Sequence, residues 1–197
     1  YLKTYYPLEF MTAVVNNFGG FYNAELYLHE ARMCGAIIHA PCINNSTYLT
    51  NIYGAAIYVG FIHISQLEQK VAAAIVEERM KNGDYHSLKD FINRLDIGKE
   101  QIELLIRIGA FRFTGMNKYE LMWEKNAVFA PASKQVHYSV LFDVDTEEYE
   151  LPIMTEGRYE QAFDEIELLG FPLCSPFDLM DSNMKADIHA DDMKKHY

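Results

Sequence analysis

Apolar residues recur at helical spacing through most of this chain. In the stretch IELLIRIG, Ile102, Leu105 and Ile106 fall at positions i, i+3 and i+4, and Gly109 follows at i+7, so all four lie on one side of a helix. Residues that favour helix starts precede several such stretches, and glycine ends most of them. We therefore predict helices over residues 7–16, 22–35, 65–83, 87–96, 98–109, 116–130 and 156–170.

The same pattern predicts caps and buried stripes. We expect Asn23 and Ser87 to cap their helices, and Ser65 to form a capping box with Glu68. Gly35 and Gly83 are expected C-terminal stops. The stripes predicted for the second and the last helix comprise Leu26, Tyr27, Glu30, Ala31 and Cys34, and Tyr159, Ala162, Phe163, Ile166 and Leu169.

The pattern changes between residues 36 and 61. β-branched and aromatic residues dominate there, and proline, asparagine and glycine interrupt them. We predict short strands within 36–39 and 48–61 around a turn at 44–46. The expected fold class is mainly α with a small β element, followed by an irregular acidic C-terminal segment from residue 131 that carries one helix.

Charge is distributed unevenly along the chain. The net charge of −11 arises from 17 basic and 28 acidic residues, and it divides as −1 over residues 1–60, +1 over 61–118 and −11 over 119–197. Only the middle third is not acidic, so a surface for nucleic acid is expected there.

No familiar catalytic or metal site is visible in the sequence. Cys34, Cys42 and Cys174 form no Cys-x-x-Cys pair, which favours free thiols in a cytoplasmic protein. Asp143 and Asp145 lie in a dense acidic run that is typical of a solvated loop. The seven histidines lack the spacing of metal ligands, and no Walker loop or Gly-x-Ser-x-Gly elbow occurs. We therefore predict no catalytic residue and no metal ligand in this chain.

Targeting and membrane segments are also missing from the pattern. No apolar run reaches the ~18 residues that would span a bilayer, and no signal peptide is visible. The sequence opens with Tyr1 in a helix-like stretch, so we expect a fragment of a longer protein without a membrane partner.

The stretch LLIRIGAFRFTGMNKYELMW, residues 104–123, breaks a good helix with two glycines and then starts another. A glycine turn can present backbone N–H groups, and the following helix directs its positive end the same way, so the corner suits a phosphate. Arg112, Asn117 and Lys118 could add donors. A plain connection between two helices explains the same pattern. An upstream counterpart, residues 60–76, has the apolar rhythm but no glycine after Gly60, and we expect it to be structural.

Several segments together resemble one protein family. The segments YLKTYYPLEFMTA, EARMCGAIIHAPCINNS, AIYVGFIHI, SLKDFINRLD, IELLIRIGAF and LLGFPLCSPF occur in the order and spacing of the bacterial DNA polymerase III alpha subunits, the C-family replicative polymerases. The resemblance runs from the first residue to nearly the last.

The resemblance implies a domain organisation. Residues 1–60 would be the C-terminal part of the fingers domain, 61–130 a helix-hairpin-helix DNA-binding region, and 131–197 an acidic connector towards an OB-fold domain. The catalytic aspartates of the family, which hold Mg2+, would precede this segment, so no cofactor is expected here although Mg2+ is expected in the parent polymerase. The implied partner is double-stranded primer-template DNA, gripped behind the active site through its phosphates without reading the sequence.

The residues assigned to phosphate contact combine the corner and the start of the preceding helix. They are Lys99, Arg112, Gly115, Asn117 and Lys118, with Gly98 and Gly109 as supporting turn positions. The first hairpin of the family usually reads isoleucine-lysine-glycine-valine-glycine, and ISQLE stands there in this chain, at 64–68. Tyr58 replaces an arginine of the family.

A second partner is implied by the internal motif with which the family binds a sliding clamp. Its best match is YSVLF, where Leu141 and Phe142 would be the apolar anchors and Tyr138 stands in the place of a glutamine. Simple packing of the aromatic residues is the alternative. The alternative for the whole chain is an acidic helical scaffold that docks a clamp or another replisome subunit and whose hairpins are vestigial.

Overall fold

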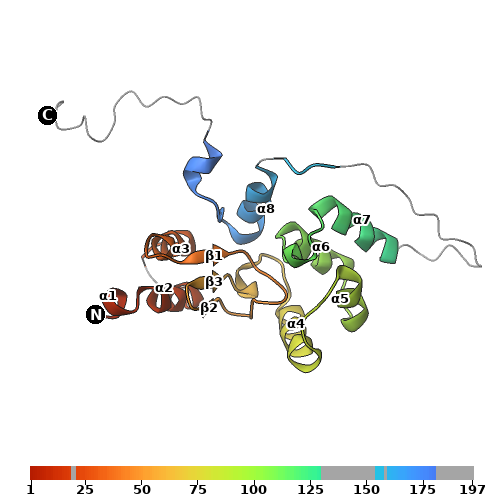
Figure 1. The fold of residues 1–197 in the computed structure, drawn as a ribbon, viewed down its shortest axis with the longest axis horizontal. Helices are drawn as coiled ribbons and strands as arrows, with labels where there is room; N and C mark the ends of the chain where they lie inside the picture. The colour runs from red at the N-terminus through yellow and green to blue at the C-terminus, as the bar shows by residue number, and fades with distance from the viewer. Residues whose placement is uncertain (19–20, 130–153, 158, 181–197) are drawn as a thin grey trace, which may run out of the picture.

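The computed structural model describes residues 1–18, 21–129, 154–157 and 159–180. In these residues the chain is mainly helical with one small sheet, so the predicted fold class is confirmed (Figure 1). The helices are α1 (Leu2–Tyr5), α2 (Pro7–Asn16), α3 (Ala24–Met33), α4 (Gln69–Asn82), α5 (Leu88–Arg94), α6 (Lys99–Arg107), α7 (Lys118–Phe129) and α8 (Glu160–Leu169). Short 3-10 turns cover η1 (Phe61–His63), η2 (Arg112–Thr114) and η3 (Pro176–Leu179).

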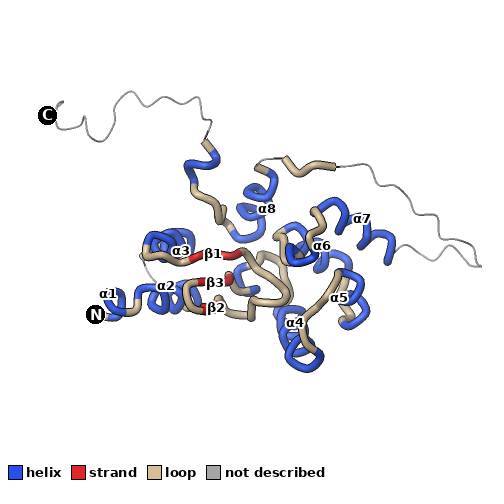
Figure 2. The backbone as a smooth tube through the Cα atoms, viewed as in Figure 1, coloured by secondary structure: helices blue, strands red, loops and turns tan. Residues whose placement is uncertain are grey.

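Three strands form the sheet, in the order β1–β3–β2. β1 (Ile37–His39) pairs parallel to β3 (Ala56–Tyr58), and β2 (Asn51–Tyr53) pairs antiparallel to β3. The short strands predicted within 48–61 are β2 and β3, and Gly54, with a φ of +61°, turns the chain between them. The sheet lies among α2 and α3, whereas α4 to α7 gather on its other side (Figure 2).

Most of the predicted helices agree with the structure at their ends. Asn23 accepts a hydrogen bond from the amide of Leu26, and Ser87 accepts one from the amide of Asp90, so both predicted caps are confirmed. The capping box at Ser65 is wrong. α4 begins only at Gln69, and the amide of Ser65 donates instead to the carbonyl of Leu168, at 2.7 Å.

Two of the predicted buried stripes are only partly correct. In α3 the fully buried residues are Leu28 and Ala31, while Leu26 is exposed. In α8 the predicted stripe is divided: Ala162 and Leu169 are buried, whereas Phe163 is 67% and Ile166 is 42% exposed. The buried side of α8 includes Asp164 and Glu165 instead, so this helix is held by charged groups as well as by apolar ones.

An aromatic core joins the two halves of the chain. Tyr85, Phe91 and Phe111 are almost completely buried and pack edge to face, with ring centroids 5.1 Å apart in each pair. The Tyr85 amide donates to the side chain of Asn44, and its hydroxyl donates to the carbonyl of Ile75. These contacts fix the sheet half against the helical half that carries the two hairpins.

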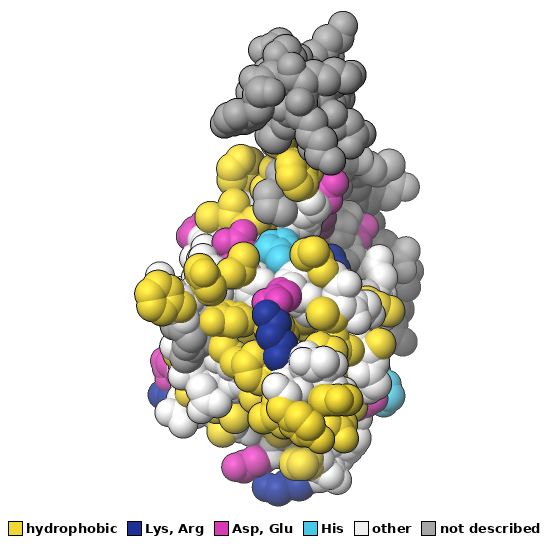
Figure 3. Space-filling model, turned by 90° about the vertical axis from the view of Figure 1, so that its left-hand side faces the viewer, with side chains coloured by type: hydrophobic (Ala, Val, Ile, Leu, Met, Phe, Trp, Pro, Cys, Tyr) yellow, Lys and Arg dark blue, Asp and Glu magenta, His cyan; other side chains and the backbone are white. Residues whose placement is uncertain are grey.

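The N-terminal end of the molecule is strongly apolar at its surface. Figure 3 shows this end, where hydrophobic side chains cover much of the face. The exposed aromatic residues of α1 and of the segment before α3 are Tyr1, Tyr5, Tyr6, Phe21 and Tyr22. Contiguous exposed apolar patches of this kind usually mark a surface that contacts a partner.

Candidate nucleic-acid interface

The second hairpin connects α6 to α7 and is anchored by its apolar half. Ile108, Ala110 and Phe111 are completely buried, so the turn cannot move away from the core without exposing them. Gly109 and Gly115 both have positive φ values, +72° and +74°, a conformation that favours glycine. The sequence thus places its two glycines where the backbone requires them.

The amides of the glycine corner are bonded inside the hairpin. The amide of Thr114 donates to the carbonyl of Phe111, at 3.0 Å, and that of Gly115 donates to Arg112, at 3.2 Å. The amide of Met116 lies 3.3 Å from the hydroxyl of Thr114. The expectation that these amides face outward is therefore not met, because the turn η2 uses them for its own backbone.

The start of α7 is capped by a reciprocal pair that the sequence prediction missed. The Asn117 side chain accepts from the amide of Glu120, at 2.9 Å, and the Glu120 carboxylate accepts from the amide of Asn117, at 2.8 Å. This is the geometry of a capping box, with asparagine in the first position. The spacing of asparagine and glutamate in NKYE could have predicted it.

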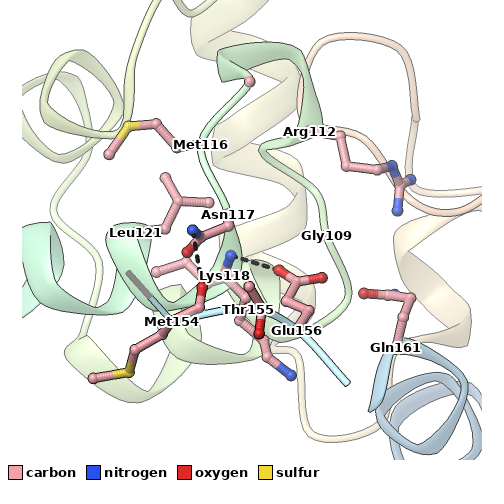
Figure 4. Close-up of a pocket in the computed structure, with 12 residues that line it drawn as sticks. Gly109, Arg112, Met116, Asn117, Lys118, Leu121, Met154, Thr155, Glu156 and Gln161 are labelled. Carbon is pink, nitrogen blue, oxygen red and sulfur yellow. Dashed lines mark hydrogen bonds between the residues drawn. The ribbon is translucent and has the colours of Figure 1, made fainter. Parts of the chain in front are cut away.

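The next amide of α7 meets a carboxylate from far along the chain. The amide of Lys118 donates to Glu156 Oε1, at 2.7 Å, and the side-chain nitrogen of Asn117 lies 3.5 Å from the carbonyl of Met154 (Figure 4). The described segment 154–157 thus lies across the hairpin and lines one wall of a cavity of about 600 Å³. A carboxylate occupies the position where the sequence predicts a phosphate.

The ammonium group of Lys118 is held by α8. Its Nζ lies 2.5 Å from Glu160 Oε1 and 2.7 Å from Asp164 Oδ2, and only 12% of the lysine side chain is exposed. Burial lowers the pKa of Lys118, but hydrogen bonds to Asp164 and Glu160 outweigh it, and the net pKa is raised. The lysine therefore stays charged and is neutralised within the chain.

Arg107 shares the same carboxylate from the other side. Its Nε donates to Asp164 Oδ1, at 2.8 Å, and its guanidinium also meets Glu167, 2.5 Å from Oε2. The bond to Glu167 is the largest cause that raises the pKa of Arg107, and the same contact lowers the pKa of Glu167. Glu160, Asp164 and Glu167 follow one another at helical spacing, so α8 presents an acidic stripe to the hairpin. The sequence shows the excess of acidic residues after residue 119, but it does not predict that they face the hairpin.

Arg112 differs from the other cations of the hairpin. Its side chain folds back over Gly109 and lies 3.3 Å from the carbonyl of Ile108, yet the residue stays exposed. A methyl group added at Gly109 would come within 2.6 Å of its guanidinium. Within the described ranges no carboxylate forms an ion pair with Arg112, and partial burial of its guanidinium lowers its pKa.

Gly98 and Lys99 lie apart from the corner. They start α6, whereas Arg112 to Lys118 follow its end, and nine helical residues span about 13 Å. Lys99 Nζ lies 5.3 Å from the centre of the Phe129 ring. A groove of about 320 Å³ lies beside these residues, and both acidic and basic side chains line it. They are Glu68, Lys70, Asp96, Lys99 and Glu100. The five residues predicted to contact phosphate and the supporting Gly98 therefore divide between the start of α6 and the second hairpin, and their role in phosphate contact stays a prediction.

The first hairpin keeps the backbone shape of a glycine turn without glycine. Gln66, which stands where the family has its first glycine, has a φ of +66°. Gln101 supports the turn from α6, because its side chain accepts from the amide of Glu68, at 2.8 Å, and donates to the carbonyl of Gln66, at 3.1 Å. These hydrogen bonds from Gln101 are consistent with the structural role expected for residues 64–68.

Several residues to which the sequence analysis gives a role lie outside the described part of the chain. Tyr138, Leu141 and Phe142, predicted to bind a clamp, lie outside it, and so do Asp143 and Asp145. Among the residues that the structure describes, no cluster of His, Cys, Asp and Glu could hold a metal ion. In the part of the chain that the structure describes, each helix is too short or too polar to span a bilayer.

Comparisons with known proteins agree with the helix-hairpin-helix geometry. The model of the helix-hairpin-helix motif family matches residues 35–121. The DNA polymerase III subunit alpha of Treponema pallidum is 28% identical over 185 residues, which cover 87% of this chain and 16% of that subunit. The corresponding subunit of Thermus aquaticus is 34% identical over 115 residues, 56% of this chain and 9% of the subunit. An error-prone DNA polymerase of Mycobacterium bovis is 29% identical over 130 residues, 64% of this chain and 12% of that polymerase. The chain thus spans 9–16% of the length of these relatives.

Proposed function

Since this chain is related to the C-family DNA polymerases of bacteria, we propose that it forms a noncatalytic part of such a polymerase and grips duplex DNA behind the active site through its phosphates. The observation that carries this proposal is the second hairpin itself. Its turn is fixed by buried residues, and an exposed cation, Arg112, lies on it without an acidic partner among the described residues. Contacts of this kind hold a duplex whatever its sequence.

In this proposal the chemistry of nucleotide transfer resides elsewhere in the parent protein. The Mg2+ that such a reaction requires would be bound by residues outside this chain, and the bacterial cytoplasm would be the place of action. Lys99, Arg112, Gly115, Asn117 and Lys118 would contact the sugar-phosphate chain, with Gly98 shaping the start of α6. The partner would be primer-template DNA.

An equilibrium titration with fluorescent duplex DNA tests the proposal. We expect binding that weakens steeply with salt, and Arg112→Glu should reduce the slope of log affinity against log salt by about one unit. Lys89→Glu is the matched control, because this exposed lysine belongs to α5 and to neither hairpin turn. Absence of duplex binding at low salt, or equal losses in the two variants, would contradict the proposal.

A second candidate function is supported by the pairing of Lys118 and Arg107 with α8. A hairpin whose cations are neutralised inside the chain suits a protein-interaction scaffold, for example one that docks a clamp or another replisome subunit. The same titration discriminates, because a scaffold would bind no duplex at any salt concentration.

A further inference from the structure

The segment 154–157 places an anion on the hairpin from within the chain. Glu156 accepts from the amide of Lys118, at 2.7 Å, at the positive end of α7. The helix dipole and an uncapped N–H favour an anion at this point, whether it is a carboxylate or a phosphate. Two different anions cannot use this amide at the same time.

The contacts of 154–157 are polar and lie at the surface: Met154 and Glu156 bond to the hairpin, and Gly157 exchanges two hydrogen bonds with Glu160 at the start of α8. All four residues of the segment are exposed, and Met154, its largest apolar side chain, is 48% exposed. α8, in contrast, is anchored by Leu168 and Leu169, which are 2% and 8% exposed, and by the buried Asp164. A segment with so little buried surface separates from its neighbours at a small free-energy difference, while α8 stays in place.

We propose that residues 154–157 form an autoinhibitory strap, in which Glu156 stands in for a backbone phosphate and must leave the hairpin before duplex DNA binds there. This inference rests on the proposed function. In the closed form the amide of Lys118 is occupied and one wall of the cavity beside it is formed by Met154, Thr155 and Glu156. In the open form the amide and the cavity face the duplex, next to Arg112, which forms no ion pair with a described carboxylate.

The strap lowers affinity without touching the DNA. When only a fraction of the molecules is open, the apparent dissociation constant is the intrinsic one divided by that fraction. If about one molecule in ten is open, removal of the strap contact tightens binding about tenfold.

The experiment compares two single variants of the 197-residue chain. Glu156→Ala removes the internal anion, and Glu77→Ala removes the same charge from an exposed position of α4 that has no ion pair among the described residues. Duplex affinity is measured over a salt series, and hydrogen exchange of the Lys118 amide is followed with and without DNA. We expect Glu156→Ala to bind about tenfold more tightly than Glu77→Ala, with the Lys118 amide protected by the duplex.

A second variant of Glu156 tests whether a change in affinity arises from local unfolding at the start of α7. Glu156→Gln retains an oxygen that accepts from the Lys118 amide but loses the charge, and we expect it to bind more tightly than Glu77→Gln. If the wild-type chain binds duplex and the Glu156 and Glu77 variants bind equally well, the strap is refuted and the proposed function stands. If no variant binds duplex even at low salt, the proposed function fails and the strap fails with it.

Discussion

The ammonium group of Lys118 lies 2.7 Å from the carboxylate of Asp164, although 46 residues separate the two in the chain. The other oxygen of the same carboxylate is 2.8 Å from Nε of Arg107. One buried acid therefore ties the end of α6, the start of α7 and the middle of α8 together. Because the carboxylate of Asp164 pairs with two cations, their attraction offsets the free-energy cost of removing this charge from water.

The first prediction concerns this bridge. Asp164→Asn keeps the shape of the side chain but removes the charge, so Lys118 and Arg107 lose a partner that is only 7% exposed. We expect the free energy of unfolding to fall by about 2 kcal/mol in a urea titration, less than for a fully buried pair because Glu160 and Glu167 remain. Glu167→Gln is the control, since 65% of that side chain is exposed, and it should change stability by less than about 0.5 kcal/mol. Equal effects of the two changes would show that Asp164 is not the bridge.

The second prediction is a pH dependence at Glu160. Bonds from Lys118, Tyr119 and the amide of Gly157 lower the pKa of this carboxyl from 4.5 to about 2. A pKa that is lower in the folded state stabilises the fold above pH 4.5, and that stabilisation is lost as the pH falls through 2. The difference in unfolding free energy between the wild type and Glu160→Gln should therefore be constant above about pH 5 and shrink towards pH 2. A difference that does not change over this range would exclude the contact.

The sequence alone predicts the local features of this fold well. Helical period gave the positions of α2, α5, α6 and α7, and the caps at Asn23 and Ser87 follow from residues that act within three positions of themselves. The glycines of the second hairpin were placed correctly for the same reason. Local rules are sufficient wherever a backbone conformation depends on its immediate neighbours.

Contacts between distant segments cannot be predicted from helical period or from capping residues. The pattern in α8 places Phe163 and Ile166 on the inside, but the ion pairs of Asp164 turn the helix so that both are exposed. The occupation of the Lys118 amide by Glu156 depends on a contact 38 residues away, which no periodicity encodes. The excess of acid in the last third was visible, yet it does not say which cation each acid meets.

The third prediction concerns the close approach of two backbones at Gly60. A Cβ at this position would lie 2.3 Å from the carbonyl carbon of Leu49 and 2.4 Å from the amide nitrogen of Thr50. Neither atom can move without shifting the chain, so Gly60→Ala should lower the free energy of unfolding by about 3 kcal/mol. Gly98→Ala is the matched control, because its φ is −64° and no atom lies within 4 Å of the added Cβ. It should lower stability by no more than about 1 kcal/mol, since alanine caps the start of a helix less well than glycine. A tolerated Gly60→Ala would mean that the β-region packs more loosely than described.

The fourth prediction concerns the turn of the first hairpin. Gln66 holds a φ of +66°, which disfavours a residue with a Cβ by about 1–2 kcal/mol, whereas glycine loses only about 0.5–1 kcal/mol more chain entropy on folding. Gln66→Gly should therefore raise the free energy of unfolding by about 0.5 kcal/mol, even though the exposed glutamine side chain is removed. Gln66→Ala is the control and should leave stability nearly unchanged, because alanine keeps the unfavourable φ. Gln101→Ala should destabilise both backgrounds alike, since the bond from its side chain goes to the carbonyl of Gln66 rather than to the substituted side chain. A glycine variant that is less stable than the alanine variant would show that the turn does not hold residue 66 in the left-handed region, and the first hairpin would then lack the backbone shape that its sequence position implies.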